Sequence, residues 1–383
     1  MRKKGILFAI VTSQFLCTSL WFAGNAVATE LSIHFDLDEQ MIGQVTSFVQ
    51  FGFIVGTLFF AVLKISDRIS PSKVFMLSAF LGAFFNVSIT FLETPELILT
   101  LRFMTGFCLA GIYPVGMKIA SDYHRKGLGK ALGYLVGALV LGTASPHLLR
   151  DFFEGVGWRY VFYSTSVFAI IGGSMVGLGV SDGPYRQNSP DVDFTSFFRV
   201  FSFRDFRSAA IGYFGHMWEL YAFWAFVPVF ISYYLNSHPN GLSVSFLSFL
   251  VIGVGSLGCV LGGYISFRSG SKIVAAISLI ISLLACLLSP FFLQLSPGLF
   301  FTLLMIWGMT VIADSPQFSS LVAQSAPRES TGTALTIVNS LGFAITIVSI
   351  QLLSHVNDPR FMFLYLSPGP LLGLWIFWKG YRA

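Results

Sequence analysis

Twelve long apolar stretches, separated mostly by short polar connections, constrain the fold of this chain more than any other feature. Each holds roughly 17–25 residues, the length that an α-helix needs to cross the hydrocarbon core of a bilayer. A helix satisfies its own backbone hydrogen bonds, which lipid cannot do. The sequence therefore predicts an all-α membrane protein with spans near residues 6–28, 41–62, 74–92, 97–120, 131–149, 158–180, 208–234, 242–265, 273–293, 299–323, 335–353 and 361–379.

The composition excludes a soluble fold. Hydrophobic residues make up 55% of the chain and charged residues only 11%, against roughly 25% charged in an average soluble domain. A single soluble core could not cover so much apolar surface. The net charge of +5 comes from basic residues scattered between apolar spans, so it indicates topology and no nucleic-acid partner. Four cysteines lie in apolar stretches without metal-ligand spacing and are expected to be buried thiols: Cys17, Cys108, Cys259 and Cys286.

The placement of Lys and Arg predicts the orientation in the membrane. With a cytoplasmic N-terminus, 18 basic residues fall in inside segments and three, Arg150, Arg159 and Arg360, fall in outside loops. This positive-inside bias also fits an even number of spans. We expect a multi-pass protein of the plasma (bacterial inner) membrane with both termini in the cytoplasm. A cleaved signal peptide ending near Ala28 is the alternative for the first span, which is nevertheless needed to complete the repeat.

The two halves of the chain are related by a nearly constant offset of 200 to 203 residues. Parallel repeats of six helices place a substrate site at their interface, near the middle of the membrane. The matching positions are Ser47-Phe48 with Ser248-Phe249, Gly52 with Gly253, Arg68 with Arg268, Gly106 with Gly308, Pro114 with Pro316, and Gly129 with Gly332.

The repeat defines the expected domains: a six-helix bundle over 1–180, a cytoplasmic linker over 181–206, and a second bundle over 207–383. In the linker, aromatic residues with helical spacing and interspersed arginines predict an amphipathic helix on the membrane surface. An early start of the seventh span is the alternative. The aromatic residues are Phe194, Phe197, Phe198 and Phe201.

The loop after the second span resembles a signature of the major facilitator superfamily, Gly-x-Leu-Ala-Asp-Arg-x-Gly-Arg-Lys. It reads Leu63-Lys-Ile-Ser-Asp67-Arg68-Ile-Ser-Pro-Ser-Lys73, with Leu63 and Ser70 in place of glycines. The fourth span opens with Arg102-Phe-Met-Thr-Gly106, similar to an Arg-x-x-x-Gly motif of the same family. The resemblance covers essentially the whole chain. It implies twelve transmembrane helices in two pseudo-symmetric six-helix bundles that transport by alternating access.

The resemblance also implies a conformational latch in this loop. Asp67 and Arg68, with Lys73 nearby, are expected to hold the cytoplasmic ends of helices, with Asp122 as the partner of Arg68. Lys118, four residues before Asp122, is a further candidate for the latch. A plain positive-inside loop with an incidental acid is the alternative.

Ionisable side chains within hydrocarbon cost several kcal/mol unless they are paired or hydrated, so each one is a functional candidate. They are Arg102 and Lys118 on span four, His216 and Glu219 on span seven, and Asp314 on span ten. In the family fold, spans one, four, seven and ten line the central cavity. We expect Glu219 and Asp314 to carry coupling protons, with Arg102 as the charge that releases them. A static salt bridge or a hydrated cavity wall is the alternative.

The candidate substrate-binding residues combine these charges with polar and aromatic side chains on the same spans. Interior packing or bonding between helices is the alternative for the uncharged members. His216, Glu219 and Asp314 offer no third nitrogen or sulfur ligand, so we expect no metal. The full set is Asn25, Gln50, Arg102, Tyr113, His216, Trp218, Glu219, Tyr221 and Asp314.

These patterns predict a secondary transporter and no enzyme. Gly127-Leu-Gly129-Lys130 lacks the spacing and hydroxyl of a nucleotide-binding loop, and no cofactor is expected. We expect a monomer in the lipid bilayer that moves a small organic solute, amphiphilic or anionic, with protons. The alternatives are a drug/proton antiporter, which Ala138 disfavours because the antiporter signature has Pro there, and an uncoupled facilitator.

Overall fold

The computed structural model describes residues 3–38, 40–124, 128–186, 200–239, 241–327 and 331–380. Every regular element in these ranges is a helix. The chain divides into two compact units, Met1–Ser189 and Pro190–Ala383. The boundary falls inside the expected linker. Residues 187–199, with Phe194, Phe197 and Phe198 of the expected surface helix, lie outside the described residues.

Ten helical segments in the described chain are long and apolar enough to cross a membrane. They match ten of the twelve expected spans, which confirms the all-helical membrane fold. In the first unit they are formed by α4 (Met41–Val62), α6 (Pro71–Ser88) with η1 (Ile89–Phe91), α7 (Ile98–Ala110) with α8 (Tyr113–Tyr123), α9 (Leu128–Phe152) and α10 (Arg159–Gly179). In the second they are α12 (Arg204–Ser237), α13 (Val244–Gly253) with α14 (Gly255–Ser269), α15 (Ser271–Phe292), α16 (Pro297–Ala313) with α17 (Ser315–Ser325), and α18 (Thr331–Ser354).

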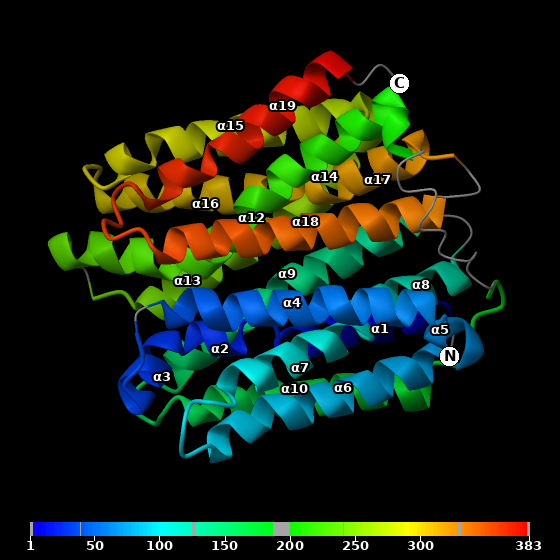
Figure 1. Cartoon of the computed structure of the whole chain (residues 1–383), viewed down its shortest axis with the longest axis horizontal. Helices are drawn as coiled ribbons and strands as arrows, with labels where there is room; N and C mark the ends of the chain where they lie inside the picture. The colour runs from blue at the N-terminus through cyan, green and yellow to red at the C-terminus, as the bar shows by residue number, and fades with distance from the viewer. Residues whose placement is uncertain are drawn as a thin grey trace. The chain divides into compact units, whose positions relative to one another are not determined.

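The two remaining spans are divided into shorter helices (Figure 1). The first comprises α1 (Lys3–Thr18), α2 (Ala23–Ala26) and α3 (Ala28–Phe35), and the last comprises η3 (Met362–Leu366) and α19 (Pro368–Gly380). A short helix, α5 (Ile65–Arg68), lies in the loop after α4. α12 begins at Arg204, slightly before the expected start of span seven.

Spans four and ten are interrupted at equivalent positions. Gly111 and Ile112 separate α7 from α8, and Asp314 separates α16 from α17. A proline follows each break, Pro114 in the first unit and Pro316 in the second. Proline has no backbone N–H, so it cannot complete the hydrogen bond to the residue four positions earlier. The 202-residue offset of the two prolines thus places the same backbone feature in both units.

Glycines allow the second and fourth spans to touch backbone to backbone. A Cβ on Gly106 of α7 would collide with the carbonyl oxygen of Val49 on α4. In the second unit, a Cβ on Gly308 of α16 would collide with the carbonyl oxygen of Val251 on α13. Both residues of the second contact lie 202 positions after those of the first. The internal repeat is therefore present as a repeated packing contact.

A second glycine contact repeats with the same offset. A Cβ on Gly56 would lie 2.6 Å from the carbonyl oxygen of Phe107, and one on Gly258 would collide with that of Met309. Small residues at such positions let membrane helices approach closely. Gly133 on α9 behaves differently: no described heavy atom lies within 4 Å of the place of its Cβ.

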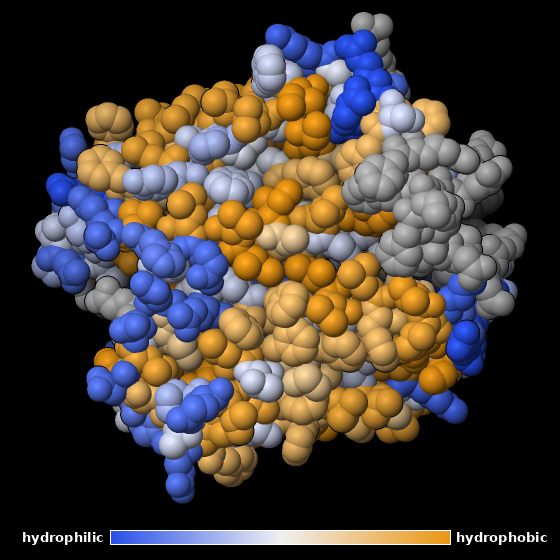
Figure 2. All heavy atoms as spheres, viewed as in Figure 1, coloured by the Kyte–Doolittle hydropathy of each residue, from blue (hydrophilic) through white to orange (hydrophobic). Residues whose placement is uncertain are grey.

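The outer faces of the helices carry large apolar side chains. On α14, Leu257, Leu261 and Ile265 lie four residues apart on one stripe and are each at least half exposed. Soluble monomers rarely expose continuous apolar surface of this kind. Figure 2 shows one face of the molecule, where apolar side chains cover much of the middle and hydrophilic ones gather toward the margins. Such a surface fits contact with lipid.

We predict that Gly106→Ala lowers the free energy of unfolding by about 1–3 kcal/mol, because α4 and α7 must separate to admit the methyl group. Thermal unfolding of the purified protein in detergent measures this. Gly133→Ala is the matched control and should be neutral or slightly stabilising, since alanine is the better helix former by about 0.5–1 kcal/mol. Equal destabilisation by both variants would contradict the packing role of Gly106.

Candidate functional site

Arg102 is buried in the first unit, where it binds the break in span one. From α7, its Nη2 donates to the carbonyl oxygens of Leu20 at 2.9 Å and Trp21 at 2.8 Å. These residues lie between α1 and α2, where the helical hydrogen bonding is interrupted. Gly24 leaves space for the guanidinium, because a Cβ there would lie 3.1 Å from Nε. Arg102 thus bonds carbonyl groups that lipid could not satisfy.

Asn86 on α6 extends the Arg102 network to α10. Its Oδ1 accepts from Nη1 of Arg102 at 2.9 Å. Its Nδ2 lies 3.0 Å from both the Thr165 and Ser166 hydroxyl oxygens. The network joins four spans, and no sequence pattern marks Asn86 as one of its members. These contacts give Arg102 a structural task, while its expected role toward solute or proton stays a prediction.

The other expected binding residues of the first unit occupy different environments. Asn25 on α2 donates to the Thr46 hydroxyl on α4 at 3.4 Å. Gln50, one turn after Thr46 on α4, is fully buried, and neither its Oε1 nor its Nε2 has a hydrogen-bond partner among the described residues. Tyr113 is half-buried at the first turn of α8.

In the second unit, the structure brings His216 and Asp314 together. His216 Nδ1 on α12 lies 2.8 Å from Asp314 Oδ1, and both side chains are at most 2% exposed. Asp314 occupies the break between α16 and α17, so the backbone interruption places the carboxylate inside the unit. The distance between these two atoms lies within the range of an ion pair. His216 is thus within reach to exchange a proton with Asp314.

Glu219 lies nearly one turn beyond His216 on α12 and is held by two neutral donors. Its Oε1 accepts from the Ser282 hydroxyl on α15 at 2.6 Å and from the Trp307 indole Nε1 on α16 at 2.5 Å. The side chain is 1% exposed. The Phe223 ring packs on the Trp307 ring, with centroids 4.5 Å apart, which fixes the indole donor. Glu219 is therefore a buried, positioned carboxyl group, as its place in span seven suggests.

The two aromatic candidates on α12, Trp218 and Tyr221, contact residues outside the His216, Asp314 and Glu219 group. Trp218 donates from Nε1 to the carbonyl oxygen of Tyr365 in η3 at 3.2 Å and packs on Gly369. Tyr221 packs against Trp224 and against Phe343 of α18, with centroid distances of 5.3 Å for both. The described contacts thus associate these rings with packing, while their solute-binding role stays a prediction.

The four cysteines are free and buried, as expected. Within the described residues, no group of three or more His, Cys, Asp and Glu side chains is arranged to hold a metal ion.

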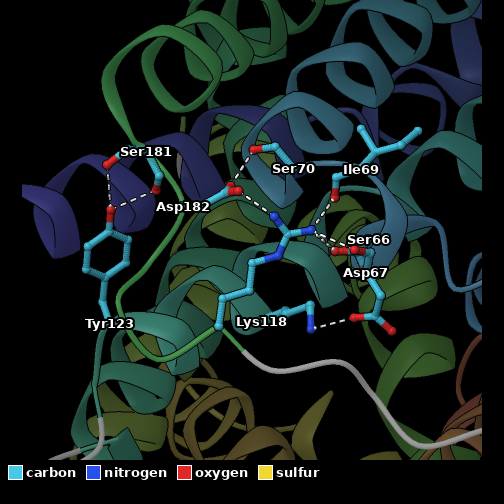
Figure 3. Close-up of polar contacts among 9 residues, drawn as sticks. Ser66, Asp67, Ile69, Ser70, Lys118, Tyr123, Ser181 and Asp182 are labelled. Atoms are coloured by element: carbon cyan, nitrogen blue, oxygen red, sulfur yellow. Dashed lines mark hydrogen bonds and ion pairs between the residues drawn. The ribbon is translucent and has the colours of Figure 1, made fainter.

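The expected latch has a different pairing from the one suggested by the family resemblance. Lys118 Nζ of α8 lies 2.8 Å from Asp67 Oδ1, and the two side chains are 16% and 7% exposed (Figure 3). In the described part of the chain no ion pair joins Arg68 to Asp122, and Arg68 is exposed. Lys73 is also exposed. Lys118, four residues before Asp122 on the same helix, reaches Asp67 in place of the expected Arg68–Asp122 pair.

The segment after α10 binds the same loop, and this contact was not expected from the sequence. Arg186 forms an ion pair with Asp182 and donates from Nη2 to the carbonyl oxygens of Asp67 at 2.7 Å and Ile69 at 3.1 Å. The hydroxyl of Ser70 donates to Asp182 Oδ1 at 2.5 Å. We call residues 181–186 the strap. The spacing of Asp182 and Arg186, four residues apart with opposite charge, was the available signal.

The strap also binds the end of span four. The Tyr123 hydroxyl on α8 donates to the carbonyl oxygen of Ser181 at 2.7 Å (Figure 3). The backbone N–H of Tyr185 donates to the carbonyl oxygen of Asp122 at 3.0 Å. Asp122 therefore contributes to this end of the unit through its backbone.

We predict that Asp67 and Lys118 are energetically coupled by about 0.5–1 kcal/mol, because their ion pair is only partly exposed to water. A double-mutant cycle with Asp67→Asn and Lys118→Met, read as free energies of unfolding, measures the coupling. The matched cycle with Arg68→Met and Asp122→Asn should give a value near zero. Coupling confined to the second cycle would restore the originally expected pair.

Comparison with known proteins supports the assignment of this architecture. The chain is 28% identical over 137 residues to the inner membrane metabolite transport protein YgcS of Escherichia coli (strain K12), which covers 34% of this chain and 30% of that protein. It is 24% identical over 200 residues to an uncharacterized transporter of Buchnera aphidicola subsp. Schizaphis graminum (strain Sg), covering 52% of this chain and 48% of that protein. The matched regions thus span less than half of each curated relative.

Solved structures share the fold over nearly the whole chain. A bacterial homologue of the human lysosomal transporter Spinster, in an inward-facing and unoccupied conformation, has a TM-score of 0.70 at 16% identity, over 99% of this chain and 95% of that one. The nucleoside transporter NupG has a TM-score of 0.74 at 15% identity, over 98% of this chain and 100% of that one. The family model described as Major Facilitator Superfamily matches residues 7–350. This chain therefore belongs to the major facilitator superfamily of transporters.

Proposed function

We propose that this transporter moves a small organic solute by alternating access and couples the movement to protons bound in its second unit. Asp314 with His216 forms one proton site, and Glu219 forms the other. The buried contact between His216 and Asp314 carries the proposal. In this proposal the protein acts as a monomer in the plasma membrane, of the bacterial inner-membrane type, with both termini in the cytoplasm.

The contact between His216 and Asp314 supports coupling because its energy depends on protonation. An isolated charge in an apolar interior costs several kcal/mol, whereas an ion pair or a fully neutral pair costs less. Adding or removing one proton therefore changes the stability of the packing between α12 and the break at Asp314. A secondary transporter needs such a link between proton occupancy and conformation.

Glu219 supports coupling in another way. Its two recorded donors, the Ser282 hydroxyl and the Trp307 indole, are neutral groups. They can hold the carboxyl oxygen in the same place whether or not the group carries a proton. A carboxyl group positioned in this way can receive and release a proton without losing its place in the unit.

The solute is proposed as a small organic metabolite, and its chemical class depends on which residues remain to bind it. Arg102 motivates an anionic solute, but its Nη groups donate to Leu20, Trp21 and Asn86. A relative described as a metabolite transport protein and a nucleoside transporter of the same fold support the broader proposal of a metabolite. The abundance of aromatic residues, 16% of the chain, favours a drug/proton antiporter as the second candidate.

We predict that Glu219→Gln and Asp314→Asn abolish solute-driven proton movement while solute exchange across the membrane continues. Gln keeps a carbonyl oxygen that accepts from Ser282 and Trp307, so the fold should persist without the proton site. Proteoliposomes loaded with a pH-sensitive dye measure proton flux, and counterflow of labelled metabolites from a broad panel measures exchange. The direction of the pH change separates symport from antiport.

Asp358→Asn is the matched control. Asp358 lies in the loop between α18 and η3, where hydrogen bonds from the Arg360 side chain lower the pKa of its carboxyl group. It therefore stays ionised throughout the neutral range, and its replacement should leave proton flux unchanged. Solute uptake without any pH change, equal in the wild type and in both variants, would refute coupling and leave a facilitator.

A further inference from the structure

Two glutamines in the first unit are fully buried without hydrogen-bond partners. They are Gln14 on α1 and Gln50 on α4, each 0% exposed. Both amide atoms of each side chain, Oε1 and Nε2, lack a partner among the described residues. Buried polar groups in proteins are nearly always hydrogen-bonded, and leaving one unmatched costs about 1–3 kcal/mol. Two whole amides without partners in the described part of the chain are therefore free to bond a molecule from outside the chain, water or solute.

Asn86 shows that this unit can satisfy a buried amide when the amide is structural. It is also 0% exposed, yet its Oδ1 accepts from Arg102 and its Nδ2 meets the Thr165 and Ser166 hydroxyls. Asn86 and the two glutamines carry the same carboxamide group and lie in the same unit, yet only Asn86 has hydrogen-bond partners among the described residues. Burial alone thus does not explain the unmatched glutamines.

Gln14 and Gln50 lie in and beside the broken first span. Gln14 lies against Gly116 of α8, where a Cβ would collide with its Oε1, so glycine leaves room for the amide. Gln50 lies on α4 one turn from Thr46, which bonds Asn25 of α2. One glutamine is therefore part of the first span, and the other lies on α4, which packs against α2 and α3 of that span.

A third helix adds unmatched polar groups beside the same span. α9 packs on α1 at Gly142, where a Cβ would collide with the Thr18 hydroxyl. α9 also carries Thr143 and His147, four residues apart on one face and at most 2% exposed. Thr143 Oγ1 and His147 Nε2 have no partner among the described residues. Unmatched groups thus occur on α1, α4 and α9, all of which contact the first span or belong to it.

We propose that Gln14 and Gln50, with Thr143 and His147, bind the transported solute, and that this solute is uncharged and rich in hydroxyl or amide groups. The inference rests on the proposed transport function and specifies its solute. An amide offers a donor and an acceptor together, which matches groups that also donate and accept. A carboxylate or phosphate only accepts and is usually met by a cation. Arg102, the buried cation of this unit, is engaged by carbonyl groups and Asn86.

Equilibrium binding to the purified full-length protein tests the inference. The uncharged probes are glucose, myo-inositol and uridine, and the anionic probes are gluconate and citrate. Each is titrated against wild type, Gln14→Leu, Gln50→Leu and the matched control Gln44→Leu, a half-buried glutamine on α4. The unfolding midpoint is recorded with and without probe, and Asn86→Leu serves as the reference for loss of a structural amide.

We expect at least one uncharged probe to bind wild type and Gln44→Leu with similar Kd. Gln14→Leu and Gln50→Leu should each raise that Kd at least tenfold, or about 1.4 kcal/mol. Without probe, both variants should unfold at the wild-type midpoint or above it, because Leu removes unmatched polar atoms. Asn86→Leu should unfold well below it.

Three results would overturn the inference. The glutamines are structural if either variant, without probe, loses as much stability as Asn86→Leu. The solute class is wrong if only gluconate or citrate binds, or if no uncharged probe binds. The site is wrong if an uncharged probe binds the glutamine variants as tightly as wild type. Binding is measured without a proton gradient, so these results are independent of the proton-flux test at Glu219 and Asp314.

Discussion

A carbonyl group released from a membrane helix must find a donor inside the protein, because lipid offers none. The first span meets this constraint at Leu20 and Trp21, whose carbonyl groups are bonded by Arg102. Arg102 is in turn bonded to Asn86, which contacts α10, the sixth span, through Thr165 and Ser166. One arginine thereby stabilises the break in the first span and holds spans one, three, four and six together.

The sequence predicted the parts of the structure that follow from hydrophobicity and periodicity. Span positions could be read from apolar length, and the repeat from a constant offset. The residue types that are expensive in lipid, such as Glu219 and Asp314, were also identifiable. The hydrogen-bond partners of Glu219 were not, because Ser282 and Trp307 are distant in sequence and ordinary in type. The break in span one could not be predicted either, because no proline marks it and its support comes from another helix.

The helix breaks and glycine contacts of the two units match more closely than their buried polar side chains do. At the shared offset of 202 residues, the break that holds Asp314 in the second unit holds Ile112 in the first. Arg102 similarly corresponds to Leu304. The glycine contacts between spans two and four recur between spans eight and ten. The same scaffold therefore presents buried amides, a histidine and one engaged arginine in the first unit, and buried acids with a histidine in the second.

The strap determines where a pull on the chain that joins the two units would act on the first unit. Because Arg186 and Asp182 are bonded to residues 67–70, the chain is held to this loop as far as Arg186, six residues after α10 is capped by Val180. Tension along the chain acts on the loop that carries Asp67 and on the end of span four, and only indirectly on α10. A pull on the chain beyond Arg186 would therefore act first on the loop in which Asp67 forms its ion pair with Lys118.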